Sequence, residues 1–188
     1  MTRLPLKQQL RVILENAARI AVIGIGSELR ADDAVGLLVL NNLRSKISAI
    51  KKRRIACKLF NGGTAPENLT GEIRRFKPDY LIMIDAVEMG KKPGACALID
   101  LEKVVISAFL THKLPIKLMF DYLSAEMKLK TVFIGVQPKI LDFDMPVSKA
   151  VVRAARSLAG LLMWALNASG QDPLFSGGKR ISCRRRRR

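Results

Sequence analysis

Short apolar runs that alternate with helical patterns constrain this chain most. Residues 19–25 (RIAVIGI) and 55–60 (IACKLF) each end at a glycine-containing turn, after which apolar residues recur at helical spacing. Residues 80–86 (YLIMIDA) form a third run that is almost wholly apolar. Such runs between helices are typical of a largely parallel sheet that is covered on both faces. The alternation therefore predicts an α/β sandwich of three layers.

The remaining segments complete this sheet. Residues 87–93 are too few for a crossover helix, so the next strand, residues 95–100, is predicted to run antiparallel at a sheet edge. A strand at residues 131–136 makes the sheet mixed, mostly parallel and five-stranded. Helices are predicted over residues 4–18, 33–44, 65–76, 116–127 and 148–168.

The length and composition indicate one globular domain. With 188 residues, of which 49% are hydrophobic and 26% charged, the chain can build a full core, which excludes a disordered chain and a small disulfide scaffold. We expect an N-terminal helical extension over residues 1–18, the domain over residues 19–168, and an unordered basic tail over residues 169–188.

Cysteine spacing and hydropathy indicate the compartment. The three cysteines stand far apart without a C-x-x-C pair, which fits a reducing environment. The N-terminus interleaves charges with apolar residues, unlike a signal peptide, and no stretch approaches the roughly 18 apolar residues of a membrane span. We therefore expect a cytoplasmic protein without membrane insertion.

Polar residues follow the predicted strands at their carboxyl ends. They are Asp32 and Asp33 after the first strand, Asn61 after the second, Asp85 at the end of the third, and His112 in a later loop. Ligand crevices in open α/β sheets form at this edge, where the strand order reverses. Two carboxylates and one imidazole suit a divalent transition metal such as nickel or zinc.

Each of these residues also has a structural interpretation. Asp85 can accept backbone amides in the turn that follows it, and Asp33 can cap the next helix. His112 is the only histidine, and a single histidine is more often structural than a ligand. Because neighbouring residues that enter a helix point about 100° apart, we expect only one of Asp32 and Asp33 to face the crevice.

Several familiar enzyme classes are excluded by missing motifs. Gly24-Ile25-Gly26 begins like a dinucleotide-binding turn, but Leu29 stands where that fingerprint needs its third glycine. The chain also lacks the P-loop, G-x-S-x-G and H-E-x-x-H patterns, which leaves no warrant for a P-loop enzyme, an α/β-hydrolase or a zincin.

Five ordered motifs resemble those of the hydrogenase maturation proteases, most closely the branch that serves hydrogenase 3-type and archaeal membrane-bound enzymes. The resemblance covers about residues 19–166. The motifs are Gly24-Ile25-Gly26 with Leu29, Asp32-Asp33 and Gly36; Asn61-Gly62-Gly63-Thr64-Ala65-Pro66-Glu67; Ile84-Asp85-Ala86; Thr111-His112-Lys113-Leu114-Pro115; and Gly135-Val136-Gln137-Pro138.

The resemblance implies a phosphorylase/hydrolase-like fold and an aspartyl endopeptidase. Its expected substrate is a [NiFe]-hydrogenase large-subunit precursor, from which it removes a C-terminal extension after nickel insertion. In that family the residues matching Asp33, Asp85 and His112 form the metal and catalytic site, and the nickel arrives with the precursor. The turn of Gly62, Gly63 and Thr64 is the expected place for the extended precursor chain, although it also reads as a tight turn in which Thr64 caps the next helix.

The sequence departs from the family pattern at four positions. Ser27 stands where the family commonly has Asn, Asn61 where it has Asp, and Ala31 and Ala34 where glycines flank the acidic pair.

Two other functions stay open. One alternative is a nickel-independent peptidase of the same fold, such as the related spore protease. The other is a basic module, suggested by the net charge of +17, that binds nucleic acid or an acidic protein. Aromatic residues do not interleave with the basic run, so nucleic acid is the less expected partner.

Overall fold

A five-stranded sheet forms the centre of the computed structural model, which describes residues 4–48, 55–100 and 114–168. The strands lie in the order β2-β1-β3-β5-β4. Strand β4 pairs antiparallel with β5, and the other neighbours are parallel. The bounds are β1 Arg19–Ile25, β2 Ala56–Gly63, β3 Tyr80–Ala86, β4 Cys96–Ile99 and β5 Lys130–Val136. The predicted mixed sheet with an antiparallel edge strand is therefore confirmed.

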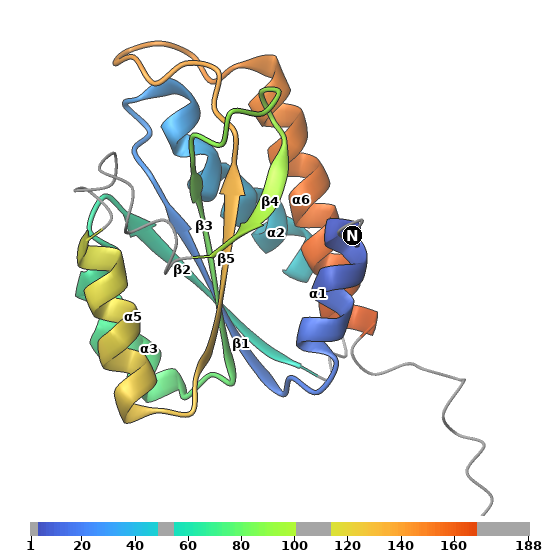
Figure 1. Ribbon diagram of the computed structural model, residues 1–188, viewed down its shortest axis with the longest axis vertical. Coiled ribbons are helices and arrows are strands. Elements are labelled where there is room, and N and C mark those ends of the chain that lie inside the picture. Colours follow the sequence, from blue (N-terminus) through green and yellow to red (C-terminus); the bar gives the residue numbers. More distant parts are fainter. Residues whose placement is uncertain (1–3, 49–54, 101–113, 169–188) are drawn as a thin grey trace, which may run out of the picture.

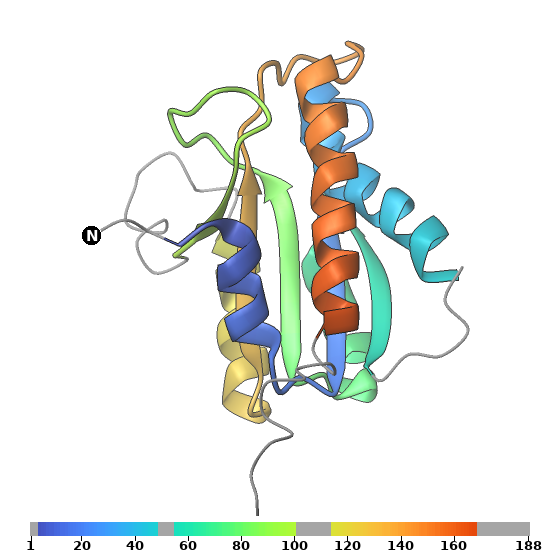
Figure 2. The ribbon, with the colours of Figure 1, turned by 90° about the vertical axis from the view of Figure 1, so that its right-hand side faces the viewer.

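Helices cover both faces of this sheet (Figures 1 and 2). One face packs against α1 (Leu6–Leu14), α2 (Val35–Ser48) and α6 (Lys149–Ala168), and the other against α3 (Thr70–Phe76) and α5 (Leu114–Glu126). Two short 3-10 helices, η1 (Ala31–Ala34) and η2 (Pro66–Leu69), precede α2 and α3. Two separate apolar clusters, one on each side of the sheet, make the predicted three layers.

The N-terminal helix is part of the core. Leu10 and Leu14 of α1 are fully buried in the cluster that α2 and α6 share. Beside them the Lys7 ammonium lies 4.3 Å from the centre of the Trp164 ring, a cation–π contact between α1 and α6. The helix predicted within residues 1–18, observed over Leu6–Leu14, therefore packs against α6.

Two local predictions are wrong. Strand β2 does not end at residue 60, because Asn61, Gly62 and Gly63 belong to it. Thr64 does not cap the helix that follows β2, because η2 begins one residue later, with Ala65 at its N-cap and no side-chain cap. The cause is an irregularity in the β1–β2 pairing, where Gly24 pairs with Asn61 but Ile25 pairs with Gly63. This extra residue moves the turn along the chain, and the Ala65 N–H donates to the Gly62 carbonyl instead.

None of the helices in the three described ranges is long and apolar enough to cross a membrane.

Candidate functional site

Two glycines bring η1 and α2 against the carboxyl ends of β1 and β3. A Cβ on Gly36 would lie 2.3 Å from the Ile25 carbonyl oxygen and 2.4 Å from that of Ile84. Gly26 has φ +129°, and a Cβ there would lie 1.8 Å from the Asp33 carbonyl oxygen. Only glycine permits these approaches, so the backbone that carries Asp33 sits directly on the strand ends.

Asp33 is a half-buried member of η1. Its Oδ2 accepts a hydrogen bond of 2.8 Å from the backbone N–H of Ser27, in the loop after β1. The other carboxylate oxygen makes no hydrogen bond within the part of the chain that the structure describes. One oxygen therefore fixes the side chain, and the second is available to a ligand.

Asp85 is the penultimate residue of β3 and is only 1% exposed. It pairs with Gly135 of β5, while its predecessor Ile84 pairs with Gly24 of β1. The chain passes from β1 to β2 on one side, and then to β3 on the other side of β1. The strand order therefore reverses between β1 and β3. Asp33 and Asp85 thus lie at the carboxyl ends of adjacent strands, at the switch point where α/β proteins bind ligands.

Asp32 has a different task from its neighbour. It is fully buried, and its carboxylate accepts hydrogen bonds from the backbone N–H groups of Lys139 (2.7 Å), Ile140 (3.1 Å) and Ser148 (2.7 Å), and from the Ser148 hydroxyl (2.9 Å). Ser148 directly precedes α6. These bonds occupy both oxygens of Asp32 and tie the loop of residues 138–148 to η1.

Gln137 organises the loop after β3, a role that the sequence analysis missed. The side chain is 4% exposed; its Oε1 accepts the N–H groups of Met89 (2.7 Å) and Lys91 (3.2 Å), and its Nε2 donates to the Glu88 carboxylate (2.8 Å). The Gly90 N–H and the Gln137 amide lower the pKa of Glu88. The sequence does place an amide side chain directly after an apolar strand. A polar side chain buried there needs several hydrogen-bond partners, which could have indicated this role.

The third predicted ligand, His112, lies outside the described residues. Within those that are described, no three His, Cys, Asp or Glu side chains come close enough together to hold a metal ion. The structure thus brings Asp33 and Asp85 to one edge of the sheet, and the complete ligand set with His112 stays a prediction.

The glycine-containing end of β2 and the turn at Thr64 lie at this same edge. Gly62 is buried, Gly63 is half-buried and Thr64 is exposed. The Gly63 N–H donates to Asn61 Oδ1 (3.0 Å), and the Gly63 carbonyl accepts the N–H of Gly26 (2.8 Å). These bonds give the turn a structural role. Contact with a precursor chain, which only Gly63 and Thr64 are exposed enough to make, stays a prediction.

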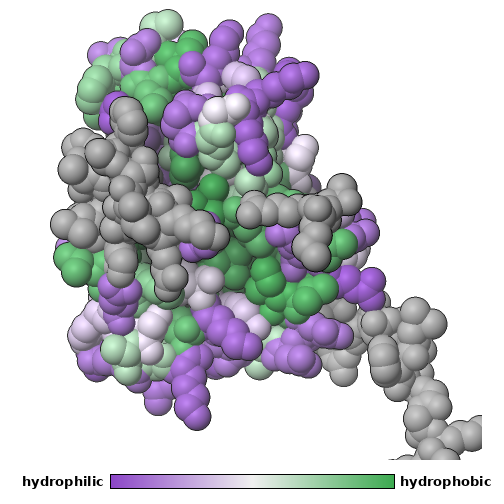
Figure 3. All heavy atoms as spheres, viewed as in Figure 1, coloured by the Kyte–Doolittle hydropathy of each residue, from purple (hydrophilic) through white to green (hydrophobic). Residues whose placement is uncertain are grey.

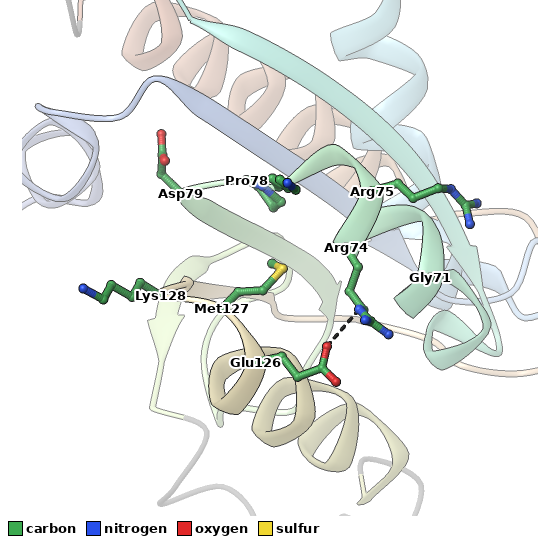
Figure 4. Close-up of a pocket in the computed structure, with 9 residues that line it drawn as sticks. Gly71, Arg74, Arg75, Pro78, Asp79, Glu126, Met127 and Lys128 are labelled. Carbon is green, nitrogen blue, oxygen red and sulfur yellow. Dashed lines mark ion pairs between the residues drawn. The ribbon is translucent and has the colours of Figure 1, made fainter.

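A separate cavity of about 720 Å³ opens at the opposite, amino end of the strands (Figure 4). Its two acids already have partners: Glu126 forms an ion pair of 2.8 Å with Arg74, and Asp79 Oδ2 accepts the N–H groups of Ala18 and Arg19 at 2.7 Å each. Because β3 and β5 begin at this cavity, the length of the sheet separates it from Asp33 and Asp85. It does not belong to the candidate site.

Comparison with known proteins identifies the family. The family model of the hydrogenase maturation proteases of the HycI type matches residues 42–163. A protein of Methanocaldococcus jannaschii assigned to the hydrogenase maturation proteases is 32% identical over 84% of this chain and 94% of its own length. The hydrogenase 3 maturation protease of Escherichia coli is 30% identical over 71% of this chain and 82% of its own.

The fold leads to the same family. The crystal structure of the [NiFe] hydrogenase maturation protease HycI from Thermococcus kodakarensis superimposes with a TM-score of 0.74 at 31% identity, covering 84% of this chain and 98% of that one. The family model, the sequence relatives and this structural match agree, and the chain belongs to the hydrogenase maturation proteases.

Proposed function

We propose that this protease removes a C-terminal extension from the large-subunit precursor of a [NiFe]-hydrogenase after nickel has been inserted. The observation that carries the proposal is the placement of Asp33 and Asp85 at the carboxyl ends of β1 and β3, in a chain of this family. The reaction adds water across one peptide bond, so that the precursor gains a new carboxylate and the extension leaves with the amine.

The nickel ion belongs to the substrate in this proposal. Asp33, Asp85 and His112 bind the ion that the precursor carries, and this docking places the scissile peptide beside them. Two observations support the two carboxylates as ligands. One oxygen of Asp33 is held by Ser27 while the other is available, and Asp85 is a buried carboxylate, whose ionised form a nearby cation stabilises. Carboxylate and imidazole together suit a divalent transition metal.

The same donor set also supports the chemistry. An ion held against the scissile bond polarises the carbonyl or a water molecule, and a carboxylate in reach accepts a proton from the attacking water. The expected consequence is a gate: a nickel-free precursor does not dock, and its extension is not removed. We also propose a cytoplasmic location, from the widely spaced cysteines without a C-x-x-C pair.

The test is the intact mass of the precursor after incubation with the full-length protein. We expect loss of a C-terminal peptide from the nickel-loaded form alone. Cleavage of both forms would instead identify a nickel-independent peptidase. If the folded protein cleaves neither form, the proposal is contradicted.

Single substitutions then test the residues. Asp33→Asn, Asp85→Asn and His112→Ala should each reduce cleavage by at least about 100-fold, the scale of a group that acts in the chemical step. Glu15→Gln is the matched control, because this exposed carboxylate follows α1 and should leave the rate unchanged. Full activity in any of the three variants would remove that residue from the site.

A further inference from the structure

Large apolar side chains gather on two loops beside the candidate site. Leu29, Leu141, Phe143 and Met145 are 65%, 37%, 66% and 48% exposed, and they make up half of the exposed large hydrophobic residues among those that the structure describes. We call these four residues the apolar rim. Hydrophobic side chains at the top of Figure 3 lie over the same two loops, which Figure 1 draws in blue and orange at that end of the sheet.

The two loops are fastened to each other. The Asp144 N–H donates to the Leu29 carbonyl (3.0 Å), and the Arg30 guanidinium donates to the Leu141 carbonyl (3.3 Å). The same guanidinium lies 5.1 Å from the centre of the Phe143 ring. Asp32 anchors the beginning of the second loop through the bonds described above. The rim is therefore held in place before anything binds, which reduces the entropy cost of binding.

The rim is continuous with the candidate site. Leu29 and Asp33 belong to one short segment between β1 and α2, and Asp32, the neighbour of Asp33, ties that segment to the loop that carries Phe143. A molecule whose reacting bond reaches Asp33 therefore extends over the rim if it is larger than a few residues. Hydrogenase maturation proteases act on proteins, and a protein substrate is large enough to cover the rim. Apolar residues inside a polar border are typical of protein interfaces.

We infer that the apolar rim is the docking surface for the hydrogenase large-subunit precursor and receives an apolar segment of that protein next to the cleavage site. This inference rests on the proposed function and adds the surface by which the substrate is held. The exposed charges of Glu28, Lys139, Asp142 and Asp144 form the polar border around the apolar contact. Binding then depends on the rim as well as on the nickel ion, whereas the chemical step depends on the carboxylates.

Steady-state cleavage of the nickel-loaded precursor tests this division. The variants Phe143→Ser and Leu29→Ser should each raise KM about 10-fold, the usual scale for a residue at the centre of an interface, and leave kcat within about twofold. Leu118→Ser on α5 and Val12→Ser on α1 are matched controls, since these side chains are 60% and 66% exposed away from the rim. Both controls should retain the wild-type KM.

The outcomes separate this inference from the proposed function. If the wild-type protein cleaves the precursor and both rim variants keep its KM, the docking surface is refuted while the function stands. A fall in kcat at constant KM would also refute it, because the rim would then act on the chemical step. A wild-type dimer that Phe143→Ser converts to a monomer, with KM unchanged, would assign the rim to a second copy of this chain. Absence of cleavage by the wild-type protein would refute the function itself.

Discussion

Replacing Asp32 by alanine should remove much of the stability of this protein, although Asp32 is not a proposed catalytic residue. The carboxylate accepts four hydrogen bonds, from the N–H groups of Lys139, Ile140 and Ser148 and from the Ser148 hydroxyl. A hydrogen bond to a charged group contributes about 1.5 to 3 kcal/mol, so four would amount to about 6 to 12 kcal/mol if all were lost without replacement.

The expected loss is smaller than this sum. Lys139 is exposed and Ile140 and Ser148 are half-buried, so water can reach part of the vacated site and satisfy some of the donors. We therefore expect Asp32→Ala to lower the free energy of unfolding by about 3 to 5 kcal/mol, at the upper end of single-substitution effects. Asp32→Asn keeps the shape of the side chain and one acceptor oxygen. It should therefore lower the free energy of unfolding by less than Asp32→Ala does.

Urea unfolding followed by circular dichroism measures these differences. Asp142→Ala is the matched control, because it removes an exposed carboxylate from the same loop and should change stability by no more than about 0.5 kcal/mol. Amide exchange at residues 139, 140 and 148 should accelerate in Asp32→Ala alone. A loss below about 1 kcal/mol for Asp32→Ala, or unchanged exchange at these amides, would refute the assignment of Asp32 as the anchor of this loop.

Three further predictions concern a closely packed glycine, a buried amide and a half-buried thiol. Gly36→Ala places a methyl group about 2.3 Å from the Ile25 carbonyl oxygen and should destabilise the protein by at least about 2 kcal/mol in urea unfolding. Gln137→Leu leaves the N–H groups of Met89 and Lys91 without their acceptor and should cost about 2 to 3 kcal/mol, with faster exchange of these amides. Burial raises the pKa of Cys96 from 9.0 to about 11. Between these pH values the folded state binds more protons than the unfolded state, so the free energy of unfolding falls as pH rises. In urea unfolding measured across this pH range, Cys96→Ala should show a shallower fall than the wild type.

Controls with the same chemical change make these results specific. Gly160→Ala adds the same methyl group in α6, where nothing lies within 4 Å, and should stabilise by about 0.5 to 1 kcal/mol. Gln8→Leu changes an exposed glutamine on α1 and should have little effect. Equal stability of Gly36→Ala and wild type, unchanged exchange in Gln137→Leu, or identical pH profiles for Cys96→Ala and wild type would each contradict the corresponding contact or pKa.

The fold was predictable because its signals are local. Apolar runs with glycine or aspartate in the penultimate position mark β1 and β3 at the observed bounds, and the short connection of residues 87–93 identifies β4 as an antiparallel edge strand. The position of Thr64 was not predictable, since the irregular pairing of β2 with β1 arises only when the two strands meet. Local sequence patterns carry no information about such a shift.

The candidate site was predictable in part for a related reason. Asp33 and Asp85 stand at the ends of apolar strands, where sheet topology alone places them together. The tasks of Asp32 and Gln137 depend on partners that are distant in the chain: Asp32 contacts Ser148, and Gln137 contacts Glu88. Periodicity and spacing in one sequence do not indicate which distant residues are in contact. The roles of Asp32 and Gln137 could therefore be recognised only from the structure.

The bonds of Asp32 also set the order in which the protease can be completed during translation. They join residues 107 to 116 positions apart, and α6, the last described element, packs on α1 and α2, which are among the first. Contacts between such distant segments form late, because the intervening chain must first be made and closed into a loop. A ribosome-bound chain that ends before Ser148 already contains Asp33 and Asp85 but not the anchor that fastens their neighbouring loop. The loop beside the candidate site is therefore fastened only after residues 139–148 have been synthesised.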